Sequence, residues 1–354
     1  MKKVYIVLED GHVFEGERFG AEGEAIGEFI FTTGMCGYVE TLTDPTYYGQ
    51  IVMHTFPLIG NYGIMEEDFE CDKSFIKAYV VREWCEAPSN FRCQYTVDEY
   101  LKKQGIVGVC GVDTREITRI IRDNGVMNAV ITDDPSKVSF EELKAYAIKD
   151  AVAQVSCKEK YTVESEEHKK KVVLVDYGKT KSIIAELTKR GCDVTVVPYN
   201  TTAEEILALG ADGIVLSNGP ADPKDNMDAV EEIKKLISKA PMLGIGLGHQ
   251  LAALALGGDT VKMQYGHHGA NQPVKSTESG KTYITSQNHG YEVVANSLSC
   301  ATESFVNAND GTCEGMKYAD KLLITTQFHP EACISPLNTH YVYDEFITMM
   351  GGND

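Results

Sequence analysis

Short apolar runs and amphipathic stretches alternate through the second half of the chain. The runs have the length of buried strands, and the stretches between them carry apolar residues at helical spacing, such as Ile183, Ile184 and Leu187. The apolar runs are residues 172–175, 194–197, 214–216 and 242–245. This alternation predicts a doubly wound α/β domain, in which a mostly parallel sheet has helices on both faces.

The first half has a different pattern, which predicts a mixed α+β domain. Two apolar runs around Asp10-Gly11 are typical of a β-hairpin, and further strands are expected near 78–81 and 106–112. Capping-type spacing predicts three helix starts, at Thr96 with Glu99, Asp113 with Glu116, and Ser139 with Glu142.

A polar segment separates the two patterns. Residues 158–171 are nearly all charged or polar and end in three lysines. We therefore expect an N-terminal domain at 1–150, a linker at 151–171 and the doubly wound domain at 172–354.

Composition narrows the possible functions. The chain has 354 residues and a formal net charge of −19, which argues against binding to nucleic acid or to anionic membranes. Nor does any apolar run approach the roughly 18 residues of a membrane span, and no export signal is evident, so we expect a cytoplasmic protein. The ten cysteines are scattered without metal-ligand spacing, which predicts reduced thiols and no metal site.

Residues 244–250, with the sequence G-I-G-L-G-H-Q, form a tight turn between a predicted strand and a predicted helix. Such a turn presents its apex residue above the sheet in a strained conformation, as in a nucleophile elbow. A thiol at the apex would be stabilised as thiolate by the helix N-terminus. The apex residue here is Gly246, which has no nucleophile.

The extended string resembles the G-I-C-L-G-H-Q motif of class I, triad-type glutamine amidotransferases, with Gly246 in place of the cysteine. Four further segments resemble motifs of the same family: S-N-G-P-A-D-P at 217–223, G-H-H-G-A-N-Q-P at 266–273, Q-N-H-G-Y at 287–291 and Q-F-H-P-E at 327–331. The N-terminal segments at 37–47, 60–63, 89–92 and 113–119 are similar to the carbamoyl phosphate synthetase small chain.

The resemblance implies a set of functional residues. Position 246 would hold the nucleophile, His329 would transfer protons and Glu331 would orient the histidine, as in a Ser-His-Asp triad. Backbone N–H groups at Leu247 and Gly219 would stabilise the oxyanion. Glutamine would be held between the domains by Thr46, Gly219, Ala221, Leu247, Gln250, Asn288, Gly290 and Tyr291.

Two of these positions depart from the family. Thr46 stands where serine is usual and keeps the hydroxyl, whereas Ala221 replaces a glycine and adds a methyl group. His249, His267 and His268 also lie in the motifs, and with no third partner evident we interpret them as structural.

The family's small chain hydrolyses glutamine and passes ammonia through a channel to a large subunit. That subunit would bind ATP and magnesium and make carbamoyl phosphate for arginine and pyrimidine synthesis, so no cofactor is expected in this chain.

With Gly246 we expect glutaminase activity to be lost or very low. Either the substitution is recent or engineered, which the retained His329 and Glu331 favour, or the chain is a natural pseudo-amidotransferase with a structural or glutamine-sensing role. A nucleotide-binding dehydrogenase is disfavoured because the turn after residue 175 has a single glycine.

Overall fold

The computed structural model describes residues 2–332 and 338–351. The chain divides into two units: unit 1 comprises residues 1–149 with 264–269, and unit 2 comprises 150–263 with 270–354. In the described ranges, no helix is both long enough and apolar enough to cross a membrane. The nine cysteines described there are free thiols, and Cys333 lies outside these ranges.

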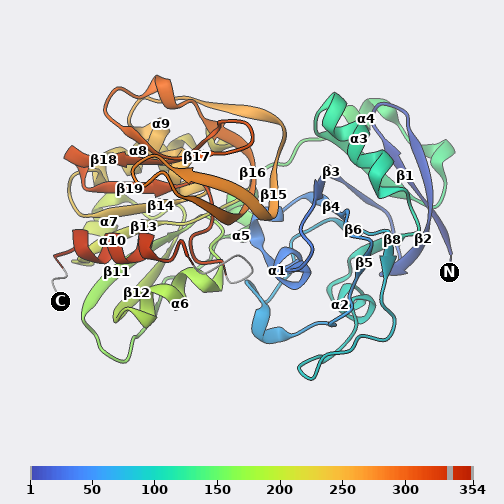
Figure 1. Ribbon diagram of the computed structural model, residues 1–354, viewed down its shortest axis with the longest axis horizontal. Coiled ribbons are helices and arrows are strands. Elements are labelled where there is room, and N and C mark those ends of the chain that lie inside the picture. The colour runs from blue at the N-terminus through green and yellow to red at the C-terminus, as the bar shows by residue number, and fades with distance from the viewer. Residues whose placement is uncertain (1, 333–337, 352–354) are drawn as a thin grey trace. The chain divides into compact units, whose positions relative to one another are not determined.

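Unit 1 is built on a closed barrel with the strand order β1-β2-β8-β6-β4-β3-β9 (Figure 1). The expected hairpin is confirmed, because β1 and β2 pair in antiparallel fashion on either side of Asp10-Gly11. The barrel strands are β1 (Lys3–Leu8), β2 (Val13–Gly20), β3 (Ala25–Thr32), β4 (Gln50–His54), β6 (Ala78–Val80), β8 (Val107–Cys110) and β9 (Met127–Thr132). A separate pair is formed by β5 (Leu58–Ile59) and β7 (Glu83–Trp84).

Alternation along the barrel strands builds two cores in unit 1. In β4, Ile51 and Met53 join one buried cluster, while Val52 between them joins another. Successive strand residues face opposite sides, so one strand contributes to both. The helices of this unit are α1 (Tyr38–Thr43), α2 (Val97–Gln104), α3 (Thr114–Asn124) and α4 (Phe140–Ala145).

The three expected helix starts are present. Thr96 and Glu99 form a complete capping box at α2. At α3 and α4 the side chains of Asp113 and Ser139 each accept a hydrogen bond from the backbone N–H three residues later. Each cap satisfies a backbone donor that the helix leaves free, which fixes where the helix begins.

Residues 264–269 belong to unit 1 although the sequence pattern assigns them to the second domain. The Val126 N–H donates to the Gln264 carbonyl over 2.7 Å, and the Gln264 amide donates to the Arg122 carbonyl over 2.9 Å. The Tyr265 ring stacks on Phe31 at 6.2 Å between centroids. These contacts join residues distant in sequence, which local periodicity cannot indicate.

Unit 2 contains the expected doubly wound sheet, which confirms the predicted fold class. Five neighbouring strands run parallel in the order β12-β11-β13-β14-β19 (Figure 1). These are β11 (Lys170–Asp176), β12 (Cys192–Pro198), β13 (Gly213–Leu216), β14 (Met242–Ile245) and β19 (Leu323–Thr326). The sheet continues through β18 (Cys313–Tyr318), β16 (Thr282–Val293), β15 (Thr260–Ser276) and β17 (Thr302–Asn307).

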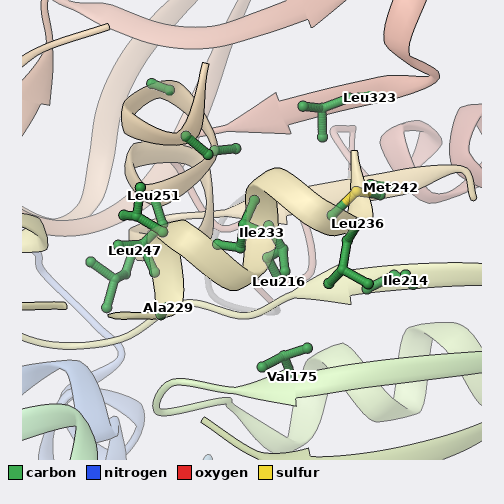
Figure 2. Close-up of a cluster of buried hydrophobic side chains, with 14 of the residues drawn as sticks. Val175, Ile214, Leu216, Ala229, Ile233, Leu236, Met242, Leu247, Leu251 and Leu323 are labelled. Atoms are coloured by element: carbon green, nitrogen blue, oxygen red, sulfur yellow. The ribbon is translucent and has the colours of Figure 1, made fainter. Parts of the chain in front are cut away.

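Helices cover both faces of the parallel strands. Along β11, Val173 and Val175 join a cluster with residues of α7, α8 and α9, whereas Val172 and Leu174 join one with residues of α6 and α10. Figure 2 shows the first cluster, with Val175 and Leu216 from strands and Ile233 and Leu251 from helices. The helices are α6 (Lys181–Lys189), α7 (Ala203–Ala208), α8 (Met227–Leu236), α9 (Leu247–Ala255) and α10 (Tyr341–Met349).

The segment expected as a linker contains secondary structure. It includes α5 (Ala151–Val155) and β10 (Tyr161–Val163), which pairs with β12. The Cys157 N–H also donates to the Asp176 carboxylate over 2.8 Å. A strand at the edge of a sheet can consist largely of polar residues. The polar composition of residues 158–171 therefore predicted a linker, although β10 lies within this segment.

Candidate active site

The turn between β14 and α9 has the geometry of a nucleophile elbow. Gly246 lies at its apex with φ 56° and ψ −112°, a conformation that residues with side chains rarely adopt. Its N–H donates to the Thr326 carbonyl at the end of β19 over 2.8 Å, and its carbonyl accepts from the N–H groups of His249 and Gln250. The apex is thereby fixed at the carboxyl ends of two adjacent parallel strands.

The three glycines of the turn have different reasons to be glycine. A Cβ at Gly248 would lie 2.2 Å from the Leu216 carbonyl oxygen, and one at Gly244 would lie 2.9 Å from the Gly248 oxygen. At Gly246 the nearest atom would be the Asn218 Cβ at 3.2 Å. Close packing therefore requires glycine on either side of the apex, whereas the apex itself has room for a side chain after a shift of a few tenths of an ångström.

The loop after β13 lies beside the elbow and is hydrogen-bonded to it. The Gly248 N–H donates to the Ser217 carbonyl over 3.0 Å, and the Ser217 hydroxyl accepts from the Tyr177 N–H over 2.9 Å. Asn218 is buried, and its amide nitrogen and oxygen have no hydrogen-bond partner among the described residues. Such unpaired buried polar atoms are uncommon and concentrate at sites that bind a ligand or water.

Ala221 in the same loop has φ 71°, in the left-handed region. An L-residue pays about 1–2 kcal/mol there, because its Cβ approaches the carbonyl oxygen that follows. The usual glycine of the family avoids this cost. The methyl group at Ala221 is thus a source of backbone strain.

His329 and Glu331 form a buried, hydrogen-bonded pair. The His329 Nδ1 lies 3.1 Å from one oxygen of Glu331, and the His329 N–H donates to the Ser286 carbonyl over 3.0 Å. This pair follows β19, whose Thr326 carbonyl binds the elbow. A carboxylate at this distance can hold an imidazole in one tautomer and stabilise its protonated form.

Two further side chains fix Glu331, and sequence patterns did not indicate either. The Tyr343 hydroxyl donates to one carboxylate oxygen over 3.2 Å, and the Thr180 hydroxyl donates to the other over 3.3 Å. Burial and the neighbouring Glu331 raise the pKa of Tyr343 well above its usual value, so it remains a donor. These partners come from α10 and the start of α6, and only the fold brings them to the carboxylate.

The residues expected to bind glutamine occupy several elements. Leu247 and Gln250 are in the first turn of α9, and Gly219 follows β13. Asn288 and Gly290 are two apart on β16 and half-buried, so they share one face of the strand. A Cβ added at Gly290 would meet nothing within 4 Å, so the face is open at that position.

Thr46 lies in unit 1, within a short 3-10 helix at Pro45–Tyr47. Its hydroxyl donates to the Asp44 carboxylate over 2.8 Å, and its N–H donates to the same oxygen over 2.9 Å. The arrangement fixes the Thr46 side chain within unit 1. Its contact with glutamine, and a pocket between the domains, stay predictions.

The histidines of the motifs have different surroundings. His249 is fully buried in α9, where its Nδ1 lies 2.7 Å from the Thr325 hydroxyl. Burial lowers the pKa of His249 to about 3, so the ring is neutral. His267 and His268 are buried and belong to the segment of unit 1 at 264–269, where His268 lies near the Tyr47 ring.

Comparison with known proteins places this site in a family. Residues 6–131 match the model of the carbamoyl-phosphate synthase small chain, CPSase domain, and residues 173–349 match that of class-I glutamine amidotransferases. The carbamoyl phosphate synthase small chain of Clostridium perfringens is 48% identical over 347 residues, covering 98% of this chain and 99% of that protein.

The chain belongs to the carbamoyl phosphate synthase small chain family. The Listeria monocytogenes small chain is also 48% identical, over 100% of this chain and 98% of its own length. The pyrimidine-specific small chain of Bacillus subtilis is 48% identical over 98% of this chain and 95% of its own. The small-chain resemblance inferred from the motifs is confirmed.

Replacing Ala221 with glycine should stabilise unit 2. Relief of the left-handed strain exceeds the added entropy of the unfolded chain, for a net gain of about 1 kcal/mol. The matched control is Ala185→Gly, at an exposed position inside α6, which should destabilise by about 1 kcal/mol. Urea unfolding of both variants tests this, and destabilisation by Ala221→Gly would contradict it.

Burial of His249 should make the protein sensitive to acid. Below pH 6.5 the imidazole of the unfolded chain takes up a proton, whereas the folded one resists protonation down to about pH 3. The free energy of unfolding should therefore fall by up to about 1.4 kcal/mol per pH unit from this group as the pH drops. In His249→Asn the pH dependence, measured by urea unfolding from pH 7 to 4, should be shallower by that amount. Equal slopes in both proteins would refute this origin.

Proposed function

We propose that this small chain binds glutamine in unit 2 but does not hydrolyse it, because its elbow carries no nucleophile. The observation that carries the proposal is the apex itself. Gly246 has the positive φ of a nucleophile elbow and space for a side chain, yet it is glycine. The buried, hydrogen-bonded pair of His329 and Glu331 is an arrangement that acyl-transfer sites use, which supports the proposal.

Hydrolysis of glutamine at this site would require a thiolate at the apex. A thiolate at position 246 would attack the side-chain carbonyl of glutamine, and His329 would protonate the departing ammonia to leave a thioester. Water, deprotonated by His329, would then release glutamate and regenerate the thiol. Glu331 would hold the imidazole, and backbone N–H groups at Leu247 and Gly219 would stabilise the oxyanion. Without the first bond none of these steps begins.

Two origins of Gly246 are compatible with this proposal. Either the cysteine was replaced recently or by design, or the chain is a natural pseudo-amidotransferase that serves as a structural or glutamine-sensing subunit. The retained His329 and Glu331 favour the first, because an inactive site gains nothing chemically from a buried imidazole and carboxylate. The genomic codon for residue 246 separates the two.

The family supports a large, ATP- and magnesium-dependent synthetase subunit as the partner. Under this proposal the small chain needs no cofactor, and ammonia enters the reaction from solution instead of through a channel from unit 2. The product, carbamoyl phosphate, would serve pyrimidine or arginine synthesis.

Replacing Gly246 with cysteine should restore glutaminase activity. We expect glutamate release to rise by several orders of magnitude in the complex with the large subunit. The control is Gly246→Ala, which adds a Cβ and the same backbone strain, about 1–3 kcal/mol, but no thiol. Adding His329→Asn to the cysteine variant should lower turnover by about 10²- to 10⁴-fold. Comparable rates of glutamate release by the glycine and cysteine forms would contradict the proposal.

The unmodified chain should form a complex that uses ammonia and not glutamine. Co-expressed with the large subunit of its own source, it should co-elute on gel filtration and yield carbamoyl phosphate from ammonium chloride. Glutamine as sole nitrogen donor should give only background. A small chain that never associates with the large subunit would contradict the proposed partner.

A further inference from the structure

Glu331 is held from two helices of unit 2. The Thr180 hydroxyl, at the N-cap of α6, donates to one carboxylate oxygen over 3.3 Å, and the Tyr343 hydroxyl, in the first turn of α10, donates to the other over 3.2 Å. The first of these oxygens also lies 3.1 Å from the His329 Nδ1. The direction of the carboxylate, and with it the hydrogen bond to the imidazole, therefore depends on how α6 and α10 are placed.

Arg190 joins the far end of α6 to the start of α10 (Figure 1). It is the C-cap residue of α6, where its Nη1 donates to the Glu186 carbonyl over 3.0 Å and to the Glu186 carboxylate. Toward α10, its Nη2 donates to the His340 carbonyl over 3.0 Å and its Nε donates to the Asp344 carboxylate over 2.6 Å. A guanidinium is a rigid plane, so donors used in these three directions fix its position between the helices.

The Arg190 guanidinium also lies over the ring of Tyr343. The Arg190 Cζ is 5.4 Å from the ring centroid, a cation–π distance. The Tyr343 N–H donates over 3.0 Å to the same His340 carbonyl that accepts from Arg190. The hydroxyl of a tyrosine lies on the long axis of its ring, so contacts that fix the ring also fix the point from which the hydroxyl donates.

Stabilising the end of α6 does not by itself require Arg190. Lys189 supplies a cation at the same end, exposed and 3.8 Å from the Glu186 carboxylate, which suits the helix dipole. Arg190, in contrast, has a side chain that is only 15% exposed, and withdrawing a charged group from water is costly. What Arg190 adds to Lys189 is its set of contacts with α10 and with the Tyr343 ring.

We propose that Arg190 is a positioning residue for the pair of Glu331 and His329, and that it acts through the Tyr343 hydroxyl. Without the guanidinium the Tyr343 ring can tilt, and its hydroxyl no longer holds the carboxylate. The carboxylate can then turn, which releases the His329 Nδ1 proton and allows the other tautomer of the imidazole. The inference rests on the proposed role of this pair as partners of a nucleophile at residue 246.

The unmodified chain allows the first test, because the pair forms in it without a nucleophile. Nitrogen NMR of the full chain, isotope-labelled at histidine, reports which ring nitrogen carries the proton, and His329→Asn identifies the signal. At alkaline pH, where the imidazole is neutral, His329 should carry its proton on Nδ1. Arg190→Met and Tyr343→Phe should each shift the tautomer ratio toward Nε2–H about tenfold, the range of one hydrogen bond to a charged group.

The second test uses the Gly246→Cys form in complex with the large subunit. Adding Arg190→Met should lower kcat for glutamate release about tenfold and leave KM within about twofold, because the substrate contacts are unchanged. Tyr343→Phe should do the same, and the two changes together should be no worse than either, since both break one connection. The matched control is Lys189→Met, which removes the other cation beside Glu186 and should change neither kcat nor the tautomer ratio.

Arg190→Lys serves if the methionine variant does not fold. It keeps a positive charge beside Glu186, but one ammonium group cannot reach Glu186, His340 and Asp344 together. We therefore expect the same shift in tautomer ratio and the same loss of kcat. Reduced stability with an unchanged tautomer ratio would show a structural role only and overturn the proposal.

The outcomes also separate this inference from the function on which it rests. If the Gly246→Cys form releases no glutamate, the proposed reaction is wrong, while the tautomer ratio in the unmodified chain still decides the role of Arg190. If that form is active, but Arg190→Met and Tyr343→Phe change neither the ratio nor kcat, only the positioning role is wrong. Additive effects of these two changes would refute action through Tyr343.

Discussion

The tight turn at Gly246 is the constraint on which the site in unit 2 depends. It fixes the end of β14 and the start of α9, and two backbone hydrogen bonds hold it, from Gly246 to Thr326 and from Gly248 to Ser217. These bonds join three parallel strands at their carboxyl ends. A longer loop between β14 and α9 would not hold the carboxyl ends of these three strands together at one point. The geometry of the site follows from backbone contacts, which do not require a side chain at residue 246.

This dependence explains how the contacts around the elbow can form with glycine at its apex. The pair of His329 and Glu331 is held by Tyr343, Thr180 and the backbone of Ser286, and none of these contacts involves residue 246. Glycine also relieves the strain that a side chain would carry at the apex. Glycine at the apex therefore leaves the contacts of the surrounding structure in place.

Two side chains beside the elbow, those of Asn218 and Gln327, bury amide atoms that have no partner among the described residues. A hydrophobic core would exclude such groups, because each costs free energy in the folded state. Natural proteins tolerate these violations at functional sites, where a ligand or water completes the bonding. The unpaired amides of Asn218 and Gln327 and the tight turn at Gly246 thus mark the same region as a site.

The sequence by itself determined the elements with strong local signals: the β-hairpin around Asp10-Gly11, the capped helices, the alternating strands of unit 2 and the strand-to-helix turn at Gly246. Each depends on neighbours within a few residues, which periodicity and capping chemistry record. Only tertiary structure decided that residues 264–269 join unit 1, that Tyr343 reaches Glu331 and that Gln250 donates a hydrogen bond to Gln327. Those contacts join residues far apart in the chain, and no local pattern records which buried side chains meet. The glycine at residue 246 was visible from the sequence, while its positive φ and the space around it required the fold.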